Sequence, residues 1–129
     1  MTRILKTALV TAALALPGAG AVAAVAPASP GPASVAVTIK AEGTDLSGEV
    51  RSTRLACKSD RTVVVFKQVG ARGGGDDRRF ASDTSGLQGG RWVWSTGNTG
   101  TEGRFYAKVK AKPGCKVAVS RTIRATRND

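Results

Sequence analysis

The sequence predicts an all-β protein, a single antiparallel β-sandwich of seven strands with one disulfide bond. Three observations favour this fold. Short runs of alternating apolar and polar residues recur along the chain, separated by clusters of glycine, asparagine, aspartate and serine. No run with the helical period of about 3.6 residues follows residue 26. The 129 residues contain 2 cysteines, enough for one bridge.

The strands are expected where these runs lie. The run 62–68 is apolar on both sides, with Val63 and Val65 opposite Val64 and Phe66, which predicts a central strand covered on both faces. Seven short strands at regular spacing are typical of a sandwich. The expected strands are 35–39, 46–50, 62–68, 79–82, 90–96, 104–110 and 116–125.

The last of these runs is irregular. Val117, Val119 and Ile123 would share one face of a regular strand, but Arg121 interrupts that face. An inserted residue explains such a break, and we expect a β-bulge near Ser120.

The two cysteines, Cys57 and Cys115, are expected to form an intramolecular disulfide. The alternatives are two free thiols and a metal pair, and a metal pair is disfavoured because the chain has no histidine. Cys57 precedes the third strand and Cys115 precedes the last, so the bridge should join two loops at one end of the sandwich. Closing so long a loop is worth about 4 kcal/mol on the chain-entropy estimate.

The N-terminal residues have the pattern of a secretory signal peptide. Arg3 and Lys6 precede an apolar run at 7–16, and small residues then offer cleavage after Ala23 or Ala26. Cleavage after Ala23 is preferred because the other site would leave a proline at the new terminus. We expect a signal peptide at 1–23, an Ala/Pro-rich linker at 24–34, a β-sandwich domain at 35–129, and a secreted or cell-envelope location with no membrane span after cleavage.

The chain is strongly basic, with 20 Lys+Arg against 9 Asp+Glu and a formal net charge of +11. Such a charge attracts polyanions, although a solvated basic surface that only resists aggregation is the alternative. On an alternating strand at 104–110, the polar residues should be exposed together on the side opposite Phe105 and Val109. The candidate polyanion-binding residues are Tyr106, Lys108, Lys110, Lys112, Lys116 and Arg121.

Catalytic and metal-binding groups are scarce. Without histidine, the usual general base and zinc ligand are missing. Asp76, Asp77 and Asp83 lack the spacing of a calcium loop, and the glycine-rich segment 71–77 predicts a mobile loop. Trp92 and Trp94 share one face of their strand and favour a core position over a stacking platform. We therefore expect no enzymatic activity, no cofactor and no metal.

Several motifs resemble those of one domain family. The segments are Leu46-x-Gly48-x-Val50, Arg61-x-Val63-x-Val65-Phe66, the turn at 82–86, the aromatic strand at Trp92 and the Gly-Arg-Phe-Tyr strand beginning at Gly103. Their order resembles the prealbumin-like sandwich of carboxypeptidase regulatory-like and Cna-B-type domains, as in small exported actinobacterial proteins. The usual Pro-Gly before the tyrosine strand is absent, and so is a counterpart of the Lys–Asn isopeptide triad. The resemblance implies a prealbumin-like or immunoglobulin-like sandwich that is a non-catalytic accessory or surface module.

Together these features predict an exported, non-catalytic module with a structural or protein-binding role. The alternative is a cationic module that binds a wall polymer, anionic lipid, glycan or nucleic acid. A third class, an enzyme inhibitor that presents the loop 71–77, fits the size and the disulfide. The natural partner is not specified by any motif; envelope polyanions and extracellular proteins are the expected classes.

Overall fold

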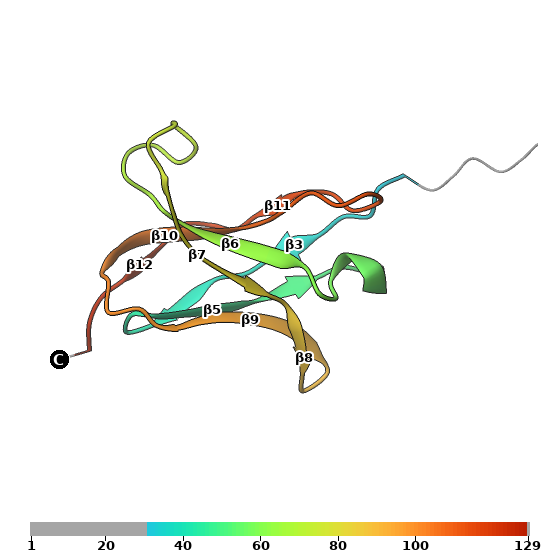
Figure 1. Ribbon diagram of the computed structural model, residues 1–129, viewed down its shortest axis with the longest axis horizontal. Helices are drawn as coiled ribbons and strands as arrows, with labels where there is room; N and C mark the ends of the chain where they lie inside the picture. The colour runs from blue at the N-terminus through green and yellow to red at the C-terminus, as the bar shows by residue number, and fades with distance from the viewer. Residues whose placement is uncertain (1–30, 129) are drawn as a thin grey trace, which may run out of the picture. The chain divides into compact units, whose positions relative to one another are not determined.

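The computed structural model describes residues 31–128, which form a β-sandwich of two antiparallel sheets (Figure 1). This confirms the expected fold class, and the Cys57–Cys115 disulfide is present. The expected signal peptide, most of the expected linker and residue 129 lie outside the described residues. Within the described range, no helix is long and apolar enough to cross a membrane.

Each sheet contains five strands. In the first sheet, a strand of seven residues at Gly103–Val109, β10, lies beside both the central and the C-terminal strands. A short 3-10 helix at Leu55–Cys57, η2, precedes the central strand. The first sheet consists of β6 (Thr62–Lys67), β7 (Arg78–Thr84), β10, β11 (Ala118–Val119) and β12 (Ile123–Ala125), in the order β11-β10-β6-β7 with β12 also paired to β10. The second sheet consists of β3 (Ala36–Val37), β4 (Lys40–Glu42), β5 (Asp45–Arg51), β8 (Gly86–Gln88) and β9 (Arg91–Asn98), in the order β3-β5-β9-β8 with β4 also paired to β5.

The described residues form ten strands where seven were expected. The expected strand 35–39 ends early as β3, and β4 follows it directly. The expected strand 116–125 divides into β11 and β12, and the short strand β8 was not anticipated. Both divisions occur at a hydroxyl side chain, Thr38 or Ser120, which bonds to the backbone of the neighbouring strand. A hydroxyl that competes for backbone groups interrupts a regular ladder without leaving its groups unsatisfied.

The core lies between the two sheets, and Trp94 is its largest fully buried side chain. Trp92 is only half-buried, which corrects the expectation that both tryptophans are core residues. From the first sheet, the inward residues of β10 and β6 complete the core. The buried cluster comprises Val37, Ile39, Leu46, Val50, Val63, Val65, Trp94, Phe105, Ala107, Val109, Ala118 and Ala125.

The absence of a side chain at Gly48 leaves room for the backbone of Thr38 beside the core. The Thr38 amide donates to the Glu49 carbonyl, and the Glu49 amide donates to the Thr38 hydroxyl, both at 2.9 Å. The Thr38 carbonyl is thereby free to accept the indole N–H of Trp94 at 3.2 Å. A Cβ added at Gly48 would lie 1.9 Å from that carbonyl oxygen and 2.7 Å from Trp94 Nε1.

The bulge expected near Ser120 is confirmed by the register of β10. Lys108 pairs with Val119, and Phe105 pairs with Ile123, so the C-terminal segment has one residue more than β10 between these pairs. The extra residue reverses which side chains face inward. Ala118 and Ile123 therefore point to the core, whereas Val119 is 47% exposed. Val119 and Ile123 were expected on one face, and the bulge places them on opposite faces.

Gly48→Ala is expected to lower the free energy of unfolding by about 3 kcal/mol or more, because the new methyl group has to displace backbone. Denaturant unfolding of the oxidised chain measures the loss. Gly86→Ala is the matched control, since a Cβ at Gly86 has no atom within 4 Å and this glycine also lies in the second sheet. Equal stability of the two variants would contradict the packing described for Thr38 and Trp94.

Candidate polyanion-binding face

Charge is distributed unequally between the two sheets. The strands of the first sheet contain one acidic residue, Asp83, and six basic residues: Lys67, Arg78, Arg79, Arg104, Lys108 and Arg124. The strands of the second sheet contain three of each kind: Lys40, Arg51 and Arg91 against Glu42, Asp45 and Glu49. Among the strand residues, the excess of positive charge therefore lies on the first sheet.

Most of these cations lie on the outer side of the first sheet. In β10, Phe105 and Ala107 point into the core, so Arg104 and Lys108 point outward. Register places Arg124 opposite Arg104, and places Arg79 opposite Phe66, which is paired with Tyr106. We call this surface the basic face, and define it by Arg72, Arg79, Arg104, Lys108, Lys110 and Arg124.

The cations of the basic face have no carboxylate partner within the described part of the chain. The two ion pairs found there, Lys40–Glu42 and Arg51–Glu49, are both on the second sheet. The basic face instead donates to backbone carbonyls, as when Arg104 Nη2 lies 3.2 Å from the Val69 oxygen. Asp77 is the acid near this face. The hydrogen bond from Tyr106 and, to a smaller extent, the charge of Arg104 lower the pKa of its carboxyl group, but Asp77 and Arg104 do not form an ion pair.

Tyr106 does not lie on the surface with the lysines, which corrects the sequence-based expectation. It points outward from β10 but is only 7% exposed. Its ring stacks on Phe66 of β6 with centroids 5.4 Å apart. The guanidinium of Arg72, in the loop between β6 and β7, lies 5.6 Å from the centroid of the Tyr106 ring. Its hydroxyl donates to Asp77 Oδ2 at 2.6 Å. Tyr106 thus lies buried under the β6–β7 loop, below the cations of the basic face.

The glycine-rich loop between β6 and β7 is held against this sheet by specific bonds, where a mobile loop was expected. The Asp77 carboxylate accepts from the Val69 amide at 3.2 Å and from the Gly73 amide at 2.8 Å. Arg72 donates to the carbonyl of Ser120 in the bulge. The loop therefore brings one cation, Arg72, onto the basic face and shields Tyr106 from solvent.

The contact between Tyr106 and Asp77 shifts the pKa of both side chains. Burial, followed by the hydrogen bond to Asp77 and the charge of that carboxylate, raises the pKa of Tyr106 to about 12. The Asp77 pKa is lowered, chiefly by the hydrogen bond from Tyr106 and then by the Gly73 amide. Both shifts favour the neutral phenol and the ionised carboxylate in the folded state.

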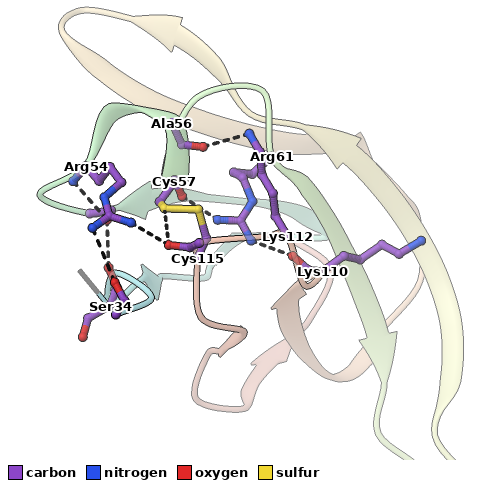
Figure 2. The surroundings of a disulfide bond; sticks show 11 residues. Ser34, Arg54, Ala56, Cys57, Arg61, Lys110, Lys112 and Cys115 are labelled. Carbon is purple, nitrogen blue, oxygen red and sulfur yellow. Dashed lines mark hydrogen bonds between the residues drawn. A yellow bond between two sulfur atoms is a disulfide. The ribbon is translucent and has the colours of Figure 1, made fainter. Parts of the chain in front are cut away.

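The disulfide fixes one end of the sandwich, as expected from the positions of the cysteines (Figure 2). Beside it, the guanidinium of Arg61 is buried, with 2% of the residue exposed. It donates to the Cys57 carbonyl at 2.7 Å and to the Lys110 carbonyl at 2.6 Å. Burial lowers the pKa of Arg61, although a guanidinium stays charged at any ordinary pH. The backbone of Lys110 is thus anchored, while its side chain extends away from the disulfide (Figure 2).

The remaining candidates lie at the margins of the basic face. Lys112 donates from Nζ to the Ala56 carbonyl at 2.9 Å, beside the disulfide. Lys116 is exposed directly after Cys115, and Arg121 is exposed in the bulge. The six candidates therefore separate: Lys108 and Lys110 lie together on the basic face, Lys112 and Lys116 at the disulfide end, Arg121 in the bulge, and Tyr106 beneath.

The sequence-based candidates left out four cations of this face, Arg72, Arg79, Arg104 and Arg124. Arg104 could have been found from alternation alone, because it has the same parity as Lys108. Arg79 could not, because a register shift between Val65 and Phe66 decides its position opposite Phe66.

Three cavities of the described residues lie away from the basic face. One is lined by Glu42, Asp45, Asn98 and Arg127 among others, the second follows the outer side of β5 and β9, and the third lies beside Leu87 and Trp94. No group of three or more histidine, cysteine, aspartate or glutamate side chains that could hold a metal occurs among residues 31–128.

Comparison with protein-family models and with curated proteins finds no match to this chain.

Titration of Tyr106 tests the burial of this site, because it is the single tyrosine of the chain. The phenolate ultraviolet absorbance of the folded chain is expected to rise with a midpoint near pH 12, against the ordinary value of about 10. Since the folded-state pKa is raised, the stabilisation that Tyr106 provides is complete below about pH 10 and is lost as the pH rises through the folded-state value.

Asp77→Asn is the control for that titration. Loss of the carboxylate charge should move the Tyr106 midpoint down toward the ordinary value. A wild-type midpoint near 10 in the folded chain would contradict both the burial of Tyr106 and its bond to Asp77.

Proposed function

We propose that this chain is an exported, non-catalytic β-sandwich module that binds polyanions on its basic face. The observation that carries the proposal is the separation of charge between the sheets. One outer face combines six cations without an ion pair among the described residues, whereas the other sheet balances its charges. If positive charge served solubility alone, it would have no reason to be placed on one side.

The geometry of the face suits a repeating anion. Lys110 directly follows the end of β10, where its amide donates to the Thr62 carbonyl. The chain is extended from Lys108 to Lys110, so the two Cα atoms are about 7 Å apart and the side chains lie on the same side. Arg104 and Arg124 are directly opposite each other on neighbouring strands. Like charges so close are unfavourable in isolation, and a bound polyanion would remove the repulsion. Condensed counterions released from the polymer would add to the affinity.

The proposed export rests on the N-terminal pattern and on the disulfide, which persists in oxidising compartments. The resemblance to prealbumin-like accessory domains supports a role without catalysis. Outside the cell, the polyanions that such a face would meet are wall polymers, lipid headgroups, sulfated glycans and released nucleic acid. A structural or protein-binding module that ignores polyanions is the competing function.

Binding to a short DNA duplex and to heparin across a salt series tests the proposal. The affinity of the oxidised chain for DNA should fall linearly with salt on logarithmic axes, by about 0.9 in slope for each phosphate contacted. Lys108→Gln/Lys110→Gln should weaken binding to both polymers and reduce the DNA slope by about 2.

The matched control is Lys40→Gln/Arg91→Gln, which removes the same charge from the second sheet. It should leave the DNA slope nearly unchanged. Equal losses in the two double variants would mean that net charge alone attracts the polymer. Failure to bind either polymer at low salt would favour the structural or protein-binding role.

A further inference from the structure

The basic face carries apolar residues that a two-layer sandwich does not need there. Antiparallel sheets with one solvated side normally alternate apolar residues inward with polar residues outward. In this sheet Val64 and Phe66 point outward from the central strand, in line with the expected two-sided apolar run. Val64 is nonetheless buried, and the β6–β7 loop reaches the Tyr106–Phe66 pair through Arg72 and Asp77.

These apolar residues alternate with the cations. Register places Val119, Lys108 and Val64 in one row across β11, β10 and β6. Val64 is 3% exposed, whereas Val119 is 47% exposed at the sheet edge. Val117 is equally exposed, at 47%, and the buried Ala118 between the two valines places both on the outer side. Two apolar side chains therefore stand among the lysines.

We propose that the basic face binds the surface of an anionic lipid bilayer, with Val117 and Val119 entering the interface between the lysines. This inference rests on the proposed function and identifies the polyanion as anionic lipid. A lipid surface offers an anionic plane with hydrocarbon directly behind it. Lys108 and Lys110 can extend their apolar stems along the valines and hold their ammonium groups at the headgroups.

Polyanions other than a lipid bilayer would contact only the charged residues of this surface. DNA or a sulfated glycan would contact the cations and leave the valines in water. An acidic protein partner would anchor apolar side chains in a pocket, since the strongest interface contacts are fully desolvated. None of the three cavities described above is lined by a residue of the basic face or by Val117 or Val119. A flat sheet surface from which Val117 and Val119 project is suited to a planar, fluid ligand such as a bilayer.

The experiment is vesicle binding by the oxidised full chain, with phosphatidylcholine vesicles that contain or lack phosphatidylglycerol. The test variant is Val117→Thr/Val119→Thr, which keeps the β-branched shape and strand propensity but puts a hydroxyl where hydrocarbon contact is needed. We expect about tenfold weaker binding to the anionic vesicles and unchanged binding to heparin and DNA.

The matched control is Leu87→Thr, which removes an exposed apolar residue, 63% exposed, from the second sheet. It should leave vesicle binding unchanged. Every variant keeps the same N-terminal residues, so the apolar run at 7–16 contributes equally to all of them. Thermal unfolding confirms that each variant is folded.

The outcomes separate this inference from the function on which it rests. Equal vesicle binding by the wild type and the threonine variant overturns the bilayer inference. So does binding to heparin or DNA without binding to anionic vesicles, a result that would support the proposed function. Binding to neither polymer nor vesicle overturns both.

Discussion

The hydrogen bond from the Ala107 amide to the Ser120 hydroxyl, 2.8 Å long and buried, determines the outer surface of the first sheet. The Ser120 amide donates to the Ala107 carbonyl, and the Ser120 hydroxyl donates to the Arg121 carbonyl. The Ser120 carbonyl accepts a hydrogen bond from Arg72. All of its polar groups are satisfied although the residue is 3% exposed. Because the extra residue enters here, Val119 faces outward, and because the Ser120 carbonyl is accessible, Arg72 is held above Tyr106.

The rest of the molecule keeps this surface rigid. The disulfide and the buried guanidinium of Arg61 fix the end at which Lys110 leaves β10. The Asp77–Tyr106 bond fixes the opposite loop. A surface whose backbone is already ordered loses little conformational entropy on binding, so the ligand meets prearranged charges. The clustered cations of the basic face repel one another in the free protein, and we propose that relief of this repulsion is part of the binding energy.

The sequence was sufficient for the fold class, the disulfide, the bulge near Ser120 and the inward residues of β10, because period-two alternation and two cysteines leave few alternatives. It was insufficient wherever strand register or a long-range hydrogen bond determines which way a side chain points or how exposed it is. Tyr106 has the parity of an exposed residue, and only the loop contacts of Asp77 and Arg72 bury it. The bulge was anticipated, but its effect on Val119 was not, although one inserted residue must exchange the faces on its two sides. The hydroxyl of Thr38, which ends β3, gives no local signal.

Amide chemical shifts of the isotopically labelled, oxidised chain, followed during titration with heparin, would locate the polyanion on one sheet or the other. The largest changes are expected in β6, β7, β10 and β11 and in the loop that carries Arg72. The amides of β4, β5 and β9 should change little, because that sheet balances its charges. Changes of equal size on both sheets, or changes confined to the second sheet, would contradict the assignment of binding to the basic face.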